Sequence, residues 1–265
     1  MTNNARSSPL QVLPLLVLLG GAPPTAQVKS PVIVFWTAYP YQLPHITHFT
    51  PNVGIGDDSE QSFSHDKLRA SGIMPLKSVP GKIAARDLTA EALAQRWGEA
   101  HEQGYAGIAI DEFGSREGEI NAKMIKALGI VRRDSAGLFI AVWHAGPLTG
   151  EFARAYGRNA DLVMLETYVA GDAYLAWKFG PKLSGAWRGG ILGKTVFALG
   201  INDVDKRLGT TVQPWANTPR ELQAQMRWIR SHAPEMPGIA FFASHASFDI
   251  QRRASEIAWS IFAGD

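Results

Sequence analysis

The feature that most constrains the fold is a repeated alternation of short apolar runs with longer stretches of helical periodicity. The runs are continuous rather than interrupted by polar residues, which is typical of strands buried on both faces of a parallel sheet. Eight such strands are predicted: VIVFW (32–36), THFTPNVGIG (47–56), IMPLKSV (73–79), YAGIAIDEF (105–113), LFIAVWH (138–144), DLVMLETY (161–168), KTVFALGI (194–201) and GIAFFASH (238–245).

Amphipathic helices are predicted in most of the intervals. TPRE (218–221) is a capping box, and Leu222, Met226 and Ile229 then fall on one helical face. Similar apolar stripes predict helices in the intervals after the third, fourth and eighth strands. Eight strands with intervening helices in residues 31–265 predict a single (β/α)8 barrel of the TIM-barrel type, which typically has about 250 residues.

A doubly wound open sheet is the alternative architecture. It usually carries a glycine-rich phosphate loop after its first strand. The corresponding segment here is WTAYP (36–40), which contains no glycine. The closed barrel is therefore the favoured interpretation.

The first residues are similar to a secretory signal. LQVLPLLVLL (10–19) follows Arg6 and precedes GGAPPTAQ (20–27), so a basic residue, a short apolar run and small residues occur in the usual order. The run is too short to span a bilayer as a helix. We expect residues 1–26 to be a signal peptide and residues 31–265 to be an exported catalytic domain, periplasmic or extracellular. A mobile apolar arm is the alternative.

Composition excludes several classes of chemistry. The chain has no cysteine, which excludes disulfides, thiolate metal sites and a cysteine nucleophile. Lys and Arg number 26 against 24 Asp and Glu, and no dense basic block occurs, so nucleic acid is not an expected partner. No nucleophile elbow, phosphate-binding loop or dinucleotide fingerprint is present. No later apolar run is long enough for a membrane helix, no cofactor is predicted, and the oligomeric state stays open.

Acidic residues end two of the predicted strands, where TIM barrels carry their active sites. Asp111 shares one side of its strand with the small residues Gly107 and Ala109, so it is expected to point into the barrel mouth. Glu166 ends an otherwise apolar strand, where an unpaired buried carboxylate would cost several kcal/mol. Glu166 therefore has either a function or a partner, such as Lys194. Asp111 and Glu166 are the candidate catalytic residues.

Further candidates for substrate contact share a position at or just beyond a strand end. They are Trp36, Tyr39, Glu112, Trp143, His144, Tyr168, Asp203 and His245. Their aromatic rings offer flat faces, and their histidines offer ring nitrogens for hydrogen bonds. A metal site built from Asp111, Glu166 and the two histidines is an alternative. However, the first strand lacks the His-x-His pattern typical of metal-dependent barrel hydrolases, so no metal is predicted.

The run GYAGIAIDE (104–112) resembles the fourth strand of glycoside hydrolase barrels, in which a glycine and an aliphatic run precede acidic residues. Chitinase-like enzymes have acids spaced by two along this strand, and that spacing is missing here. The chain resembles more closely the endo-α-1,4-polygalactosaminidase type, in which the strand ends in two adjacent acids and a glutamate closes the sixth strand. Asp111, Glu112 and Glu166 match these features. The resemblance covers the order of barrel elements and two short motifs.

These features imply a secreted glycoside hydrolase that cleaves a polysaccharide or amino-sugar polymer with two carboxyl groups. We expect Asp111 to act as nucleophile or base and Glu166 as acid. We also expect Trp143 and Tyr168 to stack on sugars beside the cleavage point. A non-catalytic carbohydrate-binding barrel and a metal-dependent hydrolase remain alternatives.

Overall fold

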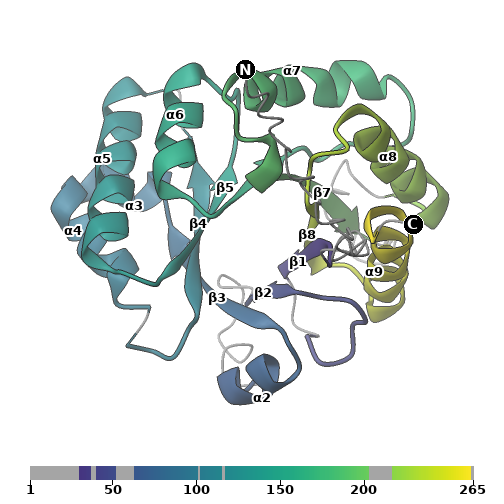
Figure 1. Ribbon diagram of the computed structural model, residues 1–265, viewed down its shortest axis with the longest axis horizontal. Helices are drawn as coiled ribbons and strands as arrows, with labels where there is room; N and C mark the ends of the chain where they lie inside the picture. The colour runs from purple at the N-terminus through teal and green to yellow at the C-terminus, as the bar shows by residue number, and fades with distance from the viewer. Residues whose placement is uncertain are drawn as a thin grey trace, which may run out of the picture.

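The protein is a closed barrel of eight parallel strands hydrogen-bonded in chain order and surrounded by helices (Figure 1). This computed structural model describes residues 30–36, 40–51, 63–100, 102–114, 117–202 and 217–263. The prediction of a single (β/α)8 TIM barrel is confirmed. The predicted signal segment, residues 1–26, lies outside the described residues.

All eight predicted strands are present in the described part of the chain. Their bounds are β1 (Val32–Trp36), β2 (His48–Thr50), β3 (Met74–Pro80), β4 (Gly107–Phe113), β5 (Phe139–His144), β6 (Leu162–Glu166), β7 (Thr195–Asn202) and β8 (Gly238–His245). The described strand β2 is shorter than the predicted run 47–56, of which residues 52–56 lie outside the described residues.

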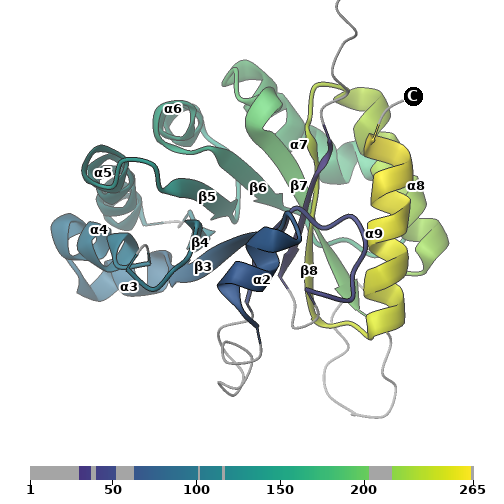
Figure 2. The ribbon, with the colours of Figure 1, turned by 60° about the horizontal axis from the view of Figure 1, so that its bottom comes forward.

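The described helices occupy the intervals between the strands. They are α2 (His65–Ala70), α3 (Lys82–Asp87), α4 (Ala90–Gly98), α5 (Gly118–Asp134), α6 (Gly150–Asn159), α7 (Leu175–Arg188), the 3-10 turn η1 (Leu192–Lys194), α8 (Pro219–His232) and α9 (Phe248–Phe262). Helices α8 and α9 pack side by side next to β7 and β8 (Figure 2). None of these helices combines the length and apolar character that crossing a membrane requires.

The capping box predicted at the start of α8 is formed. The hydroxyl oxygen of Thr218 accepts a bond from the Glu221 backbone N–H at 3.3 Å, and the Thr218 N–H donates to the Glu221 carboxylate at 2.7 Å. Both bonds use backbone N–H groups that have no partner within the helix. They therefore determine where α8 begins.

Side-chain alternation along the strands separates two cores. On β4, Ile108 and Ile110 belong to the larger core between strands and helices, whereas Ala109 belongs to the core inside the barrel. Alanines at inner positions of other strands leave room for the rings of Trp36 and Trp143, whose centroids lie 5.0 Å apart at nearly a right angle. The parity predicted for β4 is thus confirmed, and it aims Asp111 at the barrel mouth.

Candidate active site

The carboxyl end of β4 is irregular at its two acids. Its register with β5 shifts between Ile110 and Phe113, and Glu112 has a φ of 48°. This left-handed conformation costs a non-glycine residue about 1–2 kcal/mol, so the surrounding structure must hold it. Strict alternation would aim Glu112 at the helices. Its carboxylate pairs with Lys82 at the start of α3, and its charge adds to burial in raising the pKa of both Asp111 and Glu166.

Gly81, at the end of β3, fixes the backbone of this irregular segment. Its N–H donates to the Asp111 carbonyl oxygen at 2.9 Å. A Cβ atom at position 81 would lie 2.2 Å from the same oxygen, which is impossible without movement. The close passage of β3 therefore requires glycine there and helps to set the position of Asp111.

The carboxyl group of Asp111 is the most perturbed acid of the site. Burial, followed by the charges of Glu112 and Glu166, raises its pKa to about 6. The ammonium group of Lys82 opposes this shift. Asp111 therefore holds a proton at mildly acidic pH, where an ordinary aspartate is ionised.

Glu166 is placed by hydrogen bonds from two other elements. The indole N–H of Trp143 lies 3.2 Å from the Glu166 carboxylate and 3.1 Å from the Tyr168 hydroxyl oxygen. The Lys182 ammonium, on α7, donates to the backbone carbonyl of Glu166. Burial raises the pKa of Glu166, while the charge of Lys182 and the Trp143 bond lower it. An indole N–H only donates, so it favours the ionised carboxylate.

Glu112 is held by an ion pair. Its carboxylate lies 3.0 Å from the ammonium group of Lys82, the first residue of α3, and both side chains are about one-third exposed. The mouth thus combines three carboxyl groups with two ammonium groups, those of Lys82 and Lys182. Sequence reasoning missed both lysines. Lys82 directly follows the end of β3 and could have been found by its position, whereas Lys182 lies in mid-helix and gives no such signal.

The partner suggested for Glu166 from the sequence, Lys194, lies elsewhere. Its ammonium group donates to the carbonyl oxygens of Gly157 and Ala160 at 3.0 and 2.7 Å. Lys194 therefore ties the end of α6 to the turn before β7. The cation beside Glu166 is Lys182.

The expectation that Trp36 and Trp143 present their faces to a sugar is wrong. Trp36 is 4% exposed and Trp143 1% exposed, because both point into the barrel and pack against Phe242. Their rings form the floor of the mouth, and Trp143 acts on Glu166 through its N–H. Tyr168 is half-buried with its ring stacked on Phe242 at 5.5 Å, and its hydroxyl lies within the acid cluster.

His144 does not reach the mouth, which corrects its prediction as a substrate contact. It follows Trp143 on β5, so alternation turns it outward against α6, where it is fully buried. Its Nδ1 lies 2.7 Å from the Tyr156 hydroxyl and its Nε2 3.1 Å from the Pro147 carbonyl oxygen. Burial lowers its pKa to about 4. His144 is thus a neutral packing residue between β5 and α6.

Replacing Tyr156 with phenylalanine tests this assignment of His144. The change removes the hydroxyl bonded to Nδ1 and leaves a buried nitrogen without its partner, which should lower the free energy of unfolding by about 1–3 kcal/mol. Activity per folded molecule should be unchanged, since neither residue touches the acids. Urea denaturation and assays below the unfolding transition measure both quantities. If Tyr156→Phe lost activity without losing stability, His144 would have a role in the active site after all.

Three predicted residues cannot be placed. Tyr39 and Asp203 lie outside the described residues, as does the side chain of His245 at the end of β8. Among the side chains that are described, no group of three or more His, Asp or Glu converges in a way that could hold a metal ion.

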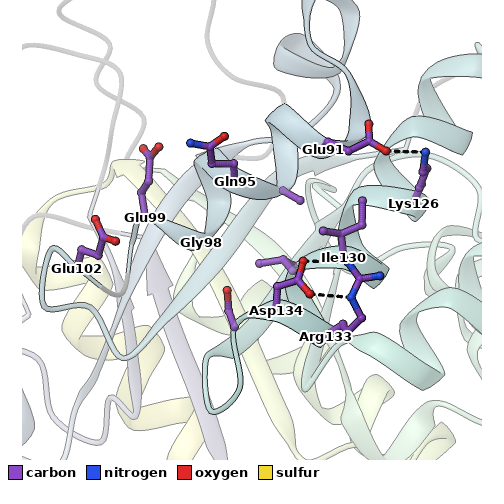
Figure 3. A pocket seen from close by; sticks show the side chains of 12 residues that line it. Glu91, Gln95, Gly98, Glu99, Glu102, Lys126, Ile130, Arg133 and Asp134 are labelled. Carbon is purple, nitrogen blue, oxygen red and sulfur yellow. Dashed lines mark hydrogen bonds and ion pairs between the residues drawn. The ribbon is translucent and has the colours of Figure 1, made fainter.

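Two hollows differ in their relation to the acids. One of about 400 Å³ lies between the ends of β4 and β5 and includes Lys82, Arg86, Gly114 and Phe152 in its lining. A larger one of about 720 Å³ lies between α4 and α5 (Figure 3). On the outer helical layer, two pairs of charged side chains in the larger hollow form ion pairs, Glu91 with Lys126 at 2.7 Å and Arg133 with Asp134 at 2.6 Å. The smaller hollow is linked to the carboxyl cluster through Lys82, the ion-pair partner of Glu112.

No protein-family model matches the chain, and none of the curated proteins matches it. Solved structures match in fold. The apo endo-β-N-acetylglucosaminidase of Cordyceps militaris gives a TM-score of 0.63 at 12% identity, over 87% of this chain and 90% of that one. A Streptomyces coelicolor protein assigned as chitinase A gives 0.62 at 12% identity, over 89% and 99%.

A monomeric dihydrodipicolinate synthase variant also matches, with a TM-score of 0.51 at 10% identity over 89% of this chain and 76% of that one. At such identities the matches show the fold alone, because one barrel supports many chemistries. The chain is a TIM-barrel protein whose structure is similar to glycoside hydrolases and also to an enzyme of a different kind.

Proposed function

We propose that the protein is a glycoside hydrolase that cleaves a polysaccharide or amino-sugar polymer with Asp111 and Glu166. The observation that carries this proposal is the presence of two partly buried carboxyl groups with raised pKa values at the mouth of a barrel. Glycosidic cleavage needs one carboxyl group to protonate the leaving oxygen and a second, ionised one to act as nucleophile or to activate water. The site supplies one carboxyl group suited to the protonated role and one suited to the ionised role.

The similar structures support a carbohydrate substrate. Two of them carry glycosidase names, and a mutant of the Cordyceps enzyme was solved in complex with fucosyl-N-acetylglucosamine-Asn, with a TM-score of 0.59 to this chain. Together with the carboxyl cluster at the strand ends, these matches favour glycoside hydrolysis over the other chemistries that the barrel supports.

The environments of the two acids favour Asp111 as proton donor and Glu166 as nucleophile or base. Asp111 lies beside two other carboxylates, and its pKa is raised to about 6. Glu166 accepts the Trp143 N–H and lies near Lys182, and both favour its ionised form. This order is the reverse of the one expected from the sequence. Glu112 and Tyr168, which lie in the same cluster, are the proposed substrate contacts.

The pH profile tests these roles. The value of kcat/KM should fall about tenfold per pH unit well above pH 6, because Asp111 loses the proton it must donate. Lys82→Met should move this alkaline limb to higher pH, because Lys82 lowers the pKa of Asp111. Release of reducing ends from a soluble polysaccharide at a series of pH values gives both results.

Arg86→Met is the matched control for Lys82→Met. Arg86 lies on α3 one helical turn beyond Lys82, and its guanidinium group pairs with Glu117. It is not among the charges that shift the pKa of Asp111. The control should keep the wild-type profile. An alkaline limb that moves equally in both variants, or moves to lower pH in Lys82→Met, would contradict the assignment of Asp111 as proton donor.

A further inference from the structure

Two exposed aromatic rings lie together at the start of α7. Among the described residues, the large hydrophobic side chains left exposed are Ile83, Tyr174, Trp177 and Trp187. Tyr174 is 82% and Trp177 80% exposed. Tyr174 is the N-cap of α7 and Trp177 lies three positions further along the chain, in the first turn, where its backbone N–H donates to the Tyr174 carbonyl oxygen at 3.1 Å. Because α7 follows β6, its first turn lies at the mouth side of the barrel, and Trp187 lies near its other end.

The segment that carries the two rings is firmly held. The side chain of Asn217 accepts a bond from the Gly171 N–H and donates to the Val169 carbonyl, both at 2.9 Å. The Gln225 amide donates to the Gly171 carbonyl at 2.7 Å. Tyr174 itself has a φ of 56°, a conformation that costs a non-glycine residue about 1–2 kcal/mol. The rings are therefore exposed on an ordered loop with locally strained backbone.

The same stretch of chain reaches the acid cluster. Tyr168 begins the loop that ends at Tyr174, and Lys182 on α7 donates to the backbone carbonyl of Glu166. Lys182 and Tyr174 are eight residues apart, which corresponds to about 12 Å along a helix. Tyr174 and the first turn of α7 thus lie about two helical turns from Lys182, on the mouth side of the barrel.

We propose that Tyr174 and Trp177 form a stacking platform for sugar units of a polymeric substrate beyond the bond that is cleaved. This inference rests on the proposed function and extends it to an elongated carbohydrate. Aromatic rings give large, rigid, uncharged contact faces. Two rings offer at most about 300–500 Å², whereas a standard protein interface buries about 800 Å² on each partner. The pair is too small for a stable protein contact and matches a narrow chain that continues into the mouth.

Gel retardation of an inactive enzyme tests the platform. The Asp111→Asn protein is run in native gels that contain hydroxyethylcellulose, xylan, glycol chitin or glycol chitosan. At least one polysaccharide should retard it. Adding Tyr174→Ala and Trp177→Ala should weaken the apparent affinity about tenfold, as expected for loss of central aromatic contacts. Adding Trp187→Ala, which removes an exposed ring at the other end of α7, should leave retardation unchanged. Melting temperatures should agree among the variants.

Three results would overturn the platform: no retardation by any of the four polysaccharides, equal retardation after removal of both rings, or a change in oligomeric state on size exclusion when the rings are removed. The last would assign the rings to contact with a second copy of the chain. The proposed hydrolysis is tested separately, by product release from the wild-type protein. Ring-dependent retardation without product release would leave the platform standing and reject hydrolysis.

Discussion

Asp111→Asn is expected to lower turnover by about 10²–10⁴-fold, the usual contribution of a general acid. Asparagine keeps the size of the side chain but cannot donate a proton of suitable acidity to a leaving oxygen. The measurement is kcat on a soluble polysaccharide, with the exposed Asp172→Asn as control. Unchanged turnover in Asp111→Asn would remove Asp111 from the mechanism.

The same substitution should stabilise the fold at neutral pH. The pKa of Asp111 is raised to about 6, so the folded protein binds its proton more tightly than the unfolded chain does. Stability therefore falls as pH rises from about 4 to 6, and above pH 6 the ionised carboxylate carries a penalty of up to about 3 kcal/mol. The uncharged amide avoids this penalty.

Urea denaturation at two pH values checks the stability gain. Asp111→Asn should raise the free energy of unfolding by about 1–3 kcal/mol at pH 7, and it should give little gain at pH 3.5, where the carboxyl group is mostly protonated in both states. A gain of the same size at both pH values, or a loss at pH 7, would show that Asp111 does not lie in the environment described.

Trp143→Ala is expected to lower the free energy of unfolding by about 3–5 kcal/mol, because it empties a ring-sized volume in the barrel interior. The side chain is 1% exposed and packs against Trp36 and Phe242. The matched control is Trp177→Ala, which removes a ring that is 80% exposed and should change stability by no more than about 0.5 kcal/mol. Equal stability of the two variants would show that Trp143 is a surface ring.

Trp143→Phe separates packing from positioning. Phenylalanine keeps most of the apolar ring but removes the N–H that bonds Glu166 and Tyr168. We expect a smaller loss of stability than in Trp143→Ala and a lower kcat with little change in KM, because Glu166 loses the donor that favours its ionised form. A wild-type kcat in Trp143→Phe would contradict the positioning role.

The barrel could be predicted because each strand carries its own signal. Continuous apolar runs and small inner residues, such as Gly107 and Ala109 on β4, follow directly from burial on both faces in a narrow barrel. The same reasoning extends to β5. Ala141 has the parity of Trp143, which places the tryptophan inside and His144 outside. The prediction that places His144 in the site rests on its position at a strand end, whereas alternation along β5 indicates the opposite side.

Other parts of the site depend on contacts that strand patterns do not encode. Glu112 at the irregular end of β4 has a left-handed backbone conformation, and its carboxylate pairs with Lys82, neither of which follows from strand alternation. Lys182 reaches Glu166 through the packing of α7, which no local motif specifies. The sequence does not predict the exposure of Tyr174 and Trp177 either, because aromatic residues at helical spacing most often belong to a core.

Incubation with a panel of polysaccharides in ¹⁸O-labelled water, followed by mass spectrometry, tests the central claim most directly. Hydrolysis by the carboxyl pair predicts that the wild type releases shorter chains with one labelled oxygen per new reducing end, and that Asp111→Asn and Glu166→Gln release at least about 100-fold less while remaining folded. No labelled product from any polysaccharide, or undiminished product from either variant, would contradict the assignment of this protein as a glycoside hydrolase that acts through Asp111 and Glu166.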